Sequence, residues 1–518
     1  MLSHFNTRRF RTKRMVQALL LGLATLTVSP ALPQVPGPQT ATAGLPNLGD
    51  GSDMTPAAER RIGDRIAREL YRDPDYLDDP VITDYVQGIW QPLIAAARQR
   101  GELPAQLDEA FAWEILMGRD RTVNAFALPG GYFGLHLGLV GIVTSRDELA
   151  SVLAHEISHV TQRHISRSMA RQAAQAPWLM GAMVLGMLAA SKNPGAAQAA
   201  IVGGQAAAVQ SQLNYSRDME READRIGFGV QTQAGFAPQG FVSMFEKLQQ
   251  SSRLNDSGGF PYLRSHPLNT ERIADMQSRV RQSERASTAP VTTLEHAMVA
   301  ARARVFSDSS VDALRVWETQ AQGSNLAKLP AVVQVGTLYG ASFAALKQRD
   351  FPLAQATLAR LQERVGTNAP ALRLARLLAL DMALAQGDVP KAQRLSQSLS
   401  DGSRATLLMR SHIDTLAGQG ESAAQTLQTW LADHPHDAQA WQALAAANAA
   451  IARPVAAVRA EAEVNVAQLD YQGALTRFKA AQDMARKSSL PTDHIDASIV
   501  DTRARQMESL LREQALER

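Results

Sequence analysis

Three side chains in the pattern His-Glu-x-x-His, namely His155, Glu156 and His159, carry the most specific chemical signal in this sequence. On a helix, residues i and i+4 lie on one face, so both imidazoles can bind the same metal ion while Glu156 lies beside them. Two imidazoles next to a carboxylate are typical of a hydrolytic zinc site, in which the carboxylate acts as the general base. The alternative is an ordinary helix that carries two core or surface histidines.

The residues around this pattern predict a buried helix. Ser145 and Glu148 match the capping box Ser-x-x-Glu at its start. Apolar residues then recur at helical spacing along one stripe: Leu149, Val152, Leu153, Ile157 and Val160. The helix can therefore hold both histidines against an apolar core.

A hydrolytic zinc site also needs a third protein ligand. The metzincin pattern would place a glycine at position 162 and a histidine at position 165, but the chain has Gln162 and Ile165. His164 lies one residue too early for that pattern. The third ligand must therefore come from elsewhere in the chain.

A later acidic segment, Glu-Arg-Glu-Ala-Asp at 220–224, offers that ligand. Glu220 is the candidate, and Glu222 is the next candidate. Asp224 lies one helical turn after Glu220, where its carboxylate can accept the remaining N–H of a zinc-bound histidine. The alternative for this segment is a solvated helix rich in charges.

These two motifs, together with Asn-Ala-Phe-Ala-Leu-Pro-Gly-Gly at 124–131, resemble the gluzincin peptidases of the CAAX-protease and HtpX type. Within that family the resemblance is greatest to the periplasmic beta-barrel assembly-enhancing proteases. It implies one Zn²⁺ per chain, bound by His155, His159 and Glu220, with Glu156 as the base. The resemblance is detailed over about 50–285. HtpX-type members have membrane spans, whereas this chain shows no convincing span beyond its start.

A His-Pro pair, His266 and Pro267, follows a segment rich in loop-forming residues. His266 has three possible roles: a simple turn, a donor to the oxyanion of a tetrahedral intermediate, or a neutral imidazole in the open position of the zinc. The third role would keep the enzyme inactive until a client displaces the loop. We favour this blocking role, because an exported protease among unfolded proteins benefits from restraint.

The N-terminus predicts export. Five basic residues within positions 8–14 precede a short apolar run over 18–26, as in a secretory signal peptide, and small residues permit cleavage after Ala31 or Ala43. The run is shorter than the ~20 residues of a transmembrane helix, so an uncleaved anchor is the less favoured alternative. The chain has no cysteine, which excludes a lipoprotein acceptor and a disulfide scaffold. We therefore expect a periplasmic protein.

The charge balance argues against a nucleic-acid-binding protein. The chain has 53 basic and 50 acidic residues and a net charge of +3, and the basic excess is contained in the leader. We find no basic stripe and no nucleic-acid motif. Hydrophobic residues make up 45% of the 518 positions, which is sufficient for more than one core.

Composition divides the chain into three parts. We expect a signal peptide over 1–31, with its end as late as 43, a zinc metallopeptidase domain over 55–285, and a tetratricopeptide-like helical repeat domain over 294–518. Turn signals in the last part recur 33 residues apart, as between Asp388 and Glu421. The predicted fold class is α+β and mostly helical, with a gluzincin-like domain followed by an all-α solenoid. The solenoid would bind a protein partner on its concave face, or its helices merely cap the peptidase.

Within the peptidase part, the patterns predict helices over 59–70 and 82–98, a strand over 111–116 and an edge strand over 126–132. An edge strand beside a zinc helix can pair with an extended substrate. The apolar run over 178–190 is too short to span a bilayer. It predicts a helical hairpin on the core, and a lid or a peripheral membrane contact is the alternative.

The sequence thus predicts an exported zinc endopeptidase, and the resemblance implies that it acts on unfolded or misassembled envelope proteins. The resemblance implies a chaperone-like role in outer-membrane protein assembly, with the assembly machinery as partner of the repeat domain. The alternative is a noncatalytic assembly factor that binds clients through its helical repeats.

Overall fold

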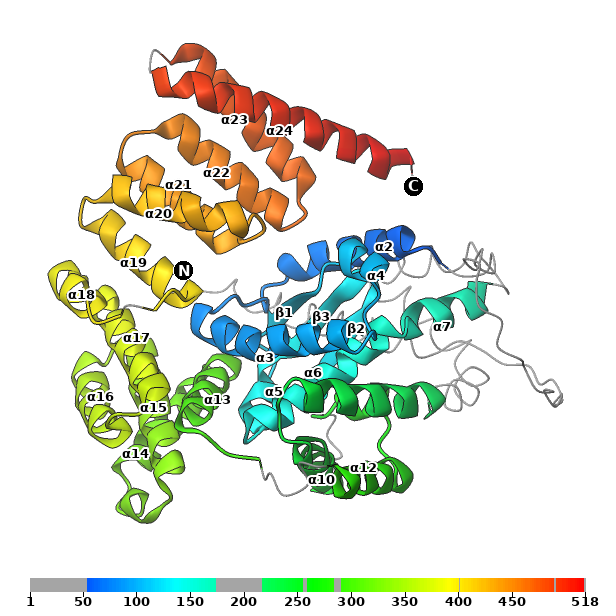
Figure 1. Cartoon of the computed structure of the whole chain (residues 1–518). Coiled ribbons are helices and arrows are strands. Elements are labelled where there is room, and N and C mark those ends of the chain that lie inside the picture. The colour runs from blue at the N-terminus through cyan, green and yellow to red at the C-terminus, as the bar shows by residue number, and fades with distance from the viewer. Residues whose placement is uncertain are drawn as a thin grey trace, which may run out of the picture.

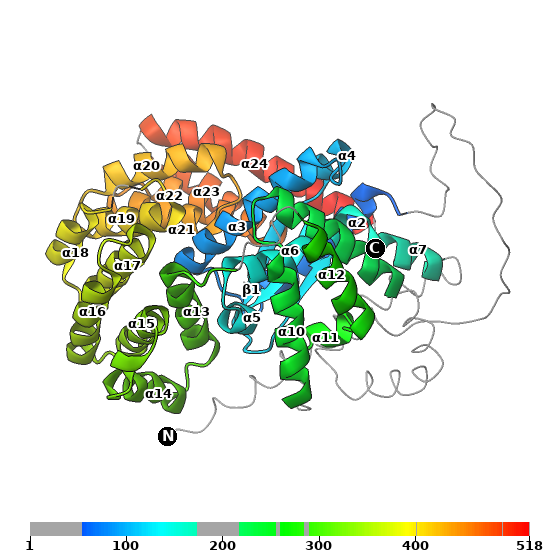
Figure 2. The same ribbon diagram turned by 60° about the horizontal axis from the view of Figure 1, so that its bottom comes forward.

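The computed structural model describes residues 54–173, 217–254, 259–283, 290–399, 401–488 and 491–516. The predicted signal peptide and the apolar run over 178–190 lie outside these residues. The described chain has a mixed N-terminal region, which contains its sheet, followed by an arc of helices (Figures 1 and 2). The predicted α+β, mostly helical fold class is therefore confirmed.

The sheet has three strands in the order β1-β3-β2. The central strand β3 (Tyr132–His136) pairs in parallel with β1 (Glu114–Gly118) and antiparallel with β2 (Ala125–Leu128). The predicted strand over 111–116 was thus placed too early. Trp113 has a φ of +50°, outside the extended region, so the strand begins only at Glu114.

The predicted edge strand over 126–132 was correct only for its first half. β2 is an edge strand, but it ends at Leu128, and Tyr132 already begins the central strand. Between them Pro129–Gly131 forms a 3₁₀ turn, in which Gly130 and Gly131 have φ of +73° and +79°. Only glycine adopts this left-handed backbone at little cost, so the two glycines reverse the chain.

The helices of the N-terminal region surround this sheet (Figure 1). The predicted helices near its start are present and extend slightly beyond their expected ends. Their bounds, together with those of the other helices, are α2 (Pro56–Tyr71), α3 (Pro80–Gln99), α4 (Ala105–Ala110), α5 (Leu137–Ile142), α6 (Arg146–Thr161), α7 (His164–Ala173), a helix over 217–233, α10 (Gln239–Leu254), α11 (Tyr262–Ser265) and α12 (Thr270–Gln282).

Helix α6 lies at the centre of this region and begins as the sequence predicts. The side chain of Ser145 accepts a hydrogen bond from the backbone N–H of Glu148 at 3.1 Å. From Glu148 to Thr161 every residue is buried. The helix is thus enclosed on all sides rather than on one face, which fixes the orientation of any side chain that it presents.

Most helices of the arc pack on the next helix along the chain, and the first one packs on the third. They are α13 (Leu294–Ser307), α14 (Val311–Gln322), α15 (Ala331–Lys347), α16 (Phe351–Val365), α17 (Ala369–Ala385), α18 (Val389–Ser396), α19 (Arg404–Leu416), α20 (Gly420–Asp433), α21 (Ala438–Ala450), α22 (Pro454–Ala467), α23 (Tyr471–Lys487) and α24 (Pro491–Leu516). A short 3₁₀ turn, Leu326–Lys328, separates α14 from α15. None of the helices in the described ranges combines the length and apolarity needed to cross a bilayer.

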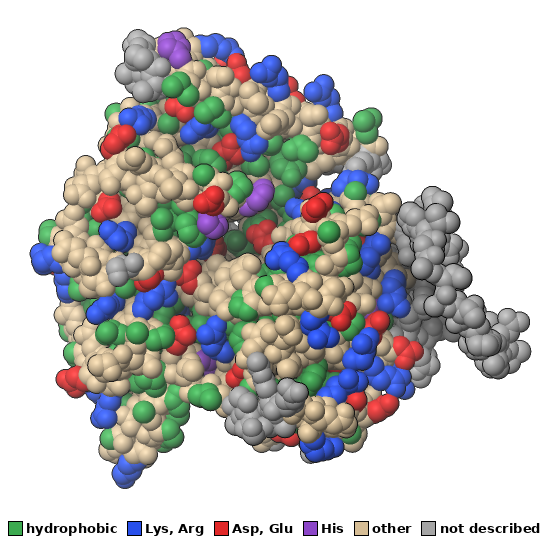
Figure 3. Space-filling model, in the orientation of Figure 1, with side chains coloured by type: hydrophobic (Ala, Val, Ile, Leu, Met, Phe, Trp, Pro, Cys, Tyr) green, Lys and Arg blue, Asp and Glu red, His purple; other side chains and the backbone are tan. Residues whose placement is uncertain are grey.

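The arc curves around the N-terminal region and is joined to it at both ends. One apolar core continues from α3 and α6 into α13, α15 and α17. At the far end, Arg68 of α2 donates a hydrogen bond to the carbonyl oxygen of Leu469, just before α23, at 2.6 Å. The space-filling view shows a hollow between the arc and the N-terminal region, with acidic and histidine side chains at its rim (Figure 3). The domain boundary over 285–294 stays a prediction.

Candidate metal centre

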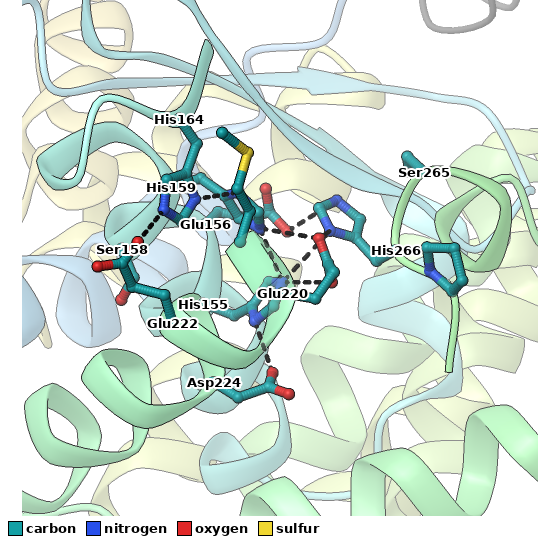
Figure 4. Close-up of polar contacts among 12 residues, drawn as sticks. His155, Glu156, Ser158, His159, His164, Glu220, Glu222, Asp224, Ser265 and His266 are labelled. Atoms are coloured by element: carbon teal, nitrogen blue, oxygen red, sulfur yellow. Dashed lines mark hydrogen bonds and ion pairs between the residues drawn. The ribbon is translucent and has the colours of Figure 1, made fainter. Parts of the chain in front are cut away.

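The two histidines of α6 lie about one turn apart on the same face of the buried helix. His155 and His159 project toward the same point, and their Nε2 atoms lie 3.0 Å apart (Figure 4). Glu220, from the helix over 217–233, faces both imidazoles, with a carboxylate oxygen 3.3 Å from each Nε2 atom. The candidate ligands thus converge from two helices that are distant in sequence.

His266 is the fourth member of this cluster. Its Nδ1 atom lies 3.0 Å from Glu220 Oε1 and 3.3 Å from His155 Nε2. Ligand atoms of all four buried residues lie within 4.8 Å of one another. His266 follows α11 directly, and its backbone N–H donates to the carbonyl oxygen of Tyr262 at 2.8 Å, so the loop aims the imidazole into the site.

The donor set fits a metal ion. Imidazole nitrogens and a carboxylate are the donors that zinc and similar divalent cations bind. Here two Nε2 lone-pair positions and one carboxylate face each other in a buried site, where one cation could be bound by all three groups at once. Glu156 lies beside this cluster, and its carboxylate is 3.4 Å from His266 Nε2.

Both carboxylate oxygens of Glu156 are buried and lack a hydrogen bond from the described part of the chain. The residue is 1% exposed, and neither of its oxygens has a hydrogen-bond partner among the described residues. A buried carboxylate without donors is costly for stability. Its position beside the candidate ligands makes Glu156 the candidate general base.

Asp224 and Arg272 fix the other side of His155. Asp224 Oδ1 lies 2.9 Å from His155 Nδ1, which leaves Nε2 to face the cluster. The guanidinium of Arg272 lies 2.6 Å from Asp224 and 2.9 Å from Glu220. Burial alone would raise the pKa of both carboxyls, but nearby positive charge holds each pKa below its usual value, with His266 ahead of Arg272 as the cause at Glu220 and Arg272 as the main cause at Asp224. Both carboxylates therefore stay ionised.

The structure brings six sequence-predicted residues into this one site. The four possible ligands and the base lie together, and Asp224 lies behind His155, where it was expected (Figure 4). The alternative ligand Glu222 points away and contacts His164 at 2.9 Å instead. Sequence reasoning gave no role to Arg272 or to His164. The sequence does show Arg272 close after the His-Pro pair. The carboxylates that it contacts, Glu220 and Asp224, lie some 50 positions earlier, so the sequence did not reveal the pairing.

Comparison with known proteins agrees with this site. Residues 84–280 match the model of peptidase family M48. The chain is 28% identical over 500 residues to the beta-barrel assembly-enhancing protease of Escherichia coli K12. This match covers 94% of this chain and 96% of that protein. It is 28% identical over 196 residues to the mitochondrial metalloendopeptidase OMA1 of Saccharomyces cerevisiae. This match covers 37% of this chain and 54% of that protein.

A third relative settles the family. The putative beta-barrel assembly-enhancing protease of Vibrio cholerae is 32% identical over 478 residues, or 91% of this chain and 94% of the relative. The match spans both the N-terminal region and the helical arc. Together with the family model over the metal cluster, this similarity shows that the chain belongs to peptidase family M48 and is a metalloendopeptidase.

Proposed function

We propose that this chain is a zinc-dependent endopeptidase of the periplasm that hydrolyses misfolded or misassembled envelope proteins. The observation that carries the proposal is the convergence of His155, His159 and Glu220 beside the buried carboxylate of Glu156, which accepts no hydrogen bond from the described residues. The His₂Glu donor set favours zinc, since the same set serves catalytic zinc in other peptidases.

Each residue has a part in peptide hydrolysis. When bound, zinc supplies Lewis-acid catalysis, which polarises the peptide carbonyl and makes water a better nucleophile. His155, His159 and Glu220 hold the ion, and Asp224 orients His155. Glu156 takes the proton of the attacking water and returns it to the leaving amine.

The edge strand β2 is the proposed binding strand for the substrate. It lies at one edge of the sheet and packs against α6, which carries the histidines. An extended peptide could add to this edge through backbone hydrogen bonds, which read no particular sequence. This mode of binding suits an enzyme that must accept many unfolded chains.

We propose further that His266 blocks the site. Its Nδ1 atom approaches Glu220 and His155 as closely as the other candidate ligands do. An imidazole at this position would complete the coordination of zinc and leave no place for water. A client that moves the loop after α11 would then activate the enzyme.

Export and partners rest on other observations. The basic and apolar leader favours a signal peptide with cleavage after residue 31 or as late as 43. Two relatives are named for beta-barrel assembly, which supports outer-membrane protein assembly as the setting. In this proposal the tetratricopeptide-like arc binds the assembly machinery along the hollow seen in Figure 3, and a peripheral membrane contact brings the enzyme near its clients.

The test is digestion of an unfolded protein such as casein by the purified full-length chain. Proteolysis should stop when a chelator removes the metal and return when zinc is added. Metal-independent client binding without cleavage would instead support a noncatalytic assembly factor.

A further inference from the structure

A second imidazole lies directly behind His159. The Nδ1 atoms of His159 and His164 are 2.9 Å apart, and the side chain of His164 is 2% exposed (Figure 4). The Nε2 atom of His159 faces Glu220 and His155. His159 is thus held between the metal cluster on one side and His164 on the other.

The positions of the protons follow from these contacts. When His159 binds a metal through Nε2, its Nδ1 must carry the proton and donate it to His164 Nδ1. His164 must then be the tautomer with its proton on Nε2. That Nε2 lies 2.9 Å from a carboxylate oxygen of Glu222, which accepts the hydrogen bond. Each imidazole therefore donates in the same direction, away from the metal cluster.

The outer end of this chain is anchored by charge. Arg167, one turn after His164 on α7, lies 3.2 Å from the same oxygen of Glu222. Glu222 belongs to the helix that also carries Glu220. The contacts thus join α7 to that helix at a point behind the metal cluster.

The turn after α6 places His164 where it can reach His159. Arg163 has a φ of +53°, a left-handed backbone that is uncommon outside glycine and that turns the chain back on itself. Its guanidinium lies 3.1 Å from the buried carboxylate of Glu59 on α2 and 2.9 Å from Ser166 Oγ. The side chain of Arg163 is therefore held by Glu59 and Ser166, and these contacts outside α6 maintain the strained turn.

We propose that His164 is a positioning residue, which orients His159 for metal binding through the series Glu222–His164–His159. The two histidine ligands are then supported in different ways. The Nδ1 atom of His155 lies 2.9 Å from the carboxylate of Asp224, whereas His159 donates to a neutral imidazole whose charge partner lies one residue further out. This inference rests on the proposed function, because it takes His159 to be a zinc ligand.

Two substitutions separate the two hydrogen bonds of His164. In His164→Asn, the amide oxygen branches at the position of Nδ1 and can still accept from His159, but the side chain is too short for Glu222. In His164→Gln, the amide nitrogen is at the reach of Nε2 and can still donate to Glu222, but no acceptor remains for His159. His164→Phe keeps the ring and removes both bonds.

The experiment measures the zinc affinity of the full-length chain and its variants by competition with a chromophoric chelator. We expect His164→Gln and His164→Phe to bind zinc about 10- to 100-fold more weakly, which is the usual effect of losing the group that orients a histidine ligand. His164→Asn should stay within a few-fold of the native chain. Glu271→Gln, which removes an exposed carboxylate on the neighbouring helix α12, is the matched control and should bind zinc normally.

A second readout separates positioning from folding. The visible spectrum of the cobalt-substituted protein reports the ligands, and it should change in His164→Gln but not in His164→Asn. Equal zinc affinity in the His164→Gln and native chains would overturn the inference. It would also be overturned if all three His164 variants lost the same stability without metal while their zinc affinity stayed unchanged. If the native chain itself binds no zinc, the proposed function fails. If the native chain binds zinc but His164→Gln binds it equally well, only the inference about His164 fails. The Asn and Gln pair decides the question even if the Phe variant does not fold.

Discussion

Arg302 of α13 forms a bidentate ion pair with Asp79, the residue that caps the N-terminus of α3. The two N···O distances are 2.8 and 2.7 Å, and both side chains are about 5% exposed or less. Asp79 also accepts the backbone N–H of Ile82 at 3.0 Å. One carboxylate thus caps a helix of the N-terminal region and binds the first helix of the arc.

Loss of this arginine should destabilise the whole chain. Arg302→Met leaves the buried charge of Asp79 without its partner, and breaking a buried pair in this way costs about 3–5 kcal/mol. Urea unfolding measures the loss. The control is Arg315→Met on α14, an exposed arginine, for which we expect a change below about 0.5 kcal/mol. Equal stabilities of the two variants would show that Arg302 does not join the arc to α3.

Replacement of the base should separate metal binding from chemistry. Glu156→Gln keeps the three ligands, so its zinc content should equal that of the native chain. Its rate of casein digestion should fall by about 10²-fold or more, because the proton acceptor is lost. A fully active purified variant would exclude Glu156 as the base.

Replacement of the third ligand, unlike replacement of the base, should reduce zinc binding. Glu220→Ala removes the carboxylate that faces both Nε2 atoms, so we expect the purified protein to retain far less than one zinc per chain in metal analysis. Glu271→Ala, in an exposed residue one helix away, should keep its zinc. If Glu220→Ala bound zinc normally, the third ligand would lie elsewhere, and Glu222 would be the next residue to replace.

Removal of His266 tests the block. If its imidazole occupies the open position of zinc, His266→Ala should digest casein faster than the native chain without an activating client, at unchanged zinc content. If His266 instead steadies the oxyanion, the rate should fall by about 10²-fold. An unchanged rate would mean that His266 only forms a turn.

The pH dependence of stability should include a contribution from His296 on α13. The Tyr85 hydroxyl lies 2.6 Å from its Nδ1, and its Nε2–H donates to the carbonyl oxygen of Val143 at 2.8 Å, so the buried ring is neutral. Burial lowers its pKa, although the bond to Val143 opposes the shift. The unfolded chain takes up a proton near the ordinary pKa of about 6.5 and the folded chain does not, so the free energy of unfolding must fall as the pH drops below that value.

Urea unfolding at pH 7.5 and 5.5 checks this contribution. His296→Gln removes the titrating group, and the loss of stability between the two pH values should be smaller in the variant than in the native chain. His434→Gln, in an exposed histidine of the arc, should leave the pH dependence unchanged. The same slope in native and His296→Gln chains would contradict the prediction.

Local pattern was sufficient to predict part of the site. The i, i+4 spacing of His155 and His159 and the cap at Ser145 depend on one helix alone, so the sequence predicts their geometry. Asp224 follows from Glu220 by the same reasoning. The spacing of residues within a helix does not say which other helix it meets, however, and the roles of Arg272 and His164 depend on contacts between helices.

The limits of the fold prediction have a similar cause. The edge strand was recognised from Pro129 and the glycines, but these residues alone did not show that the chain reverses within the segment. Gly130 and Gly131 make that reversal, and the central strand is already formed at Tyr132. The late start of β1 depends on one left-handed residue, Trp113, a conformation that a tryptophan seldom adopts.

The attachment of the arc at both ends has a geometric consequence. Because Arg302 joins its first helix to α3, and Arg68 joins the turn before α23 to α2, the arc cannot swing freely against β2. A client bound on the arc would reach β2 only with a segment long enough to span a fixed separation. Tethering at a fixed span raises the local concentration of some segments and excludes shorter ones. The position of cleavage would then be determined by its distance along the chain from the segment of the client that is bound on the arc.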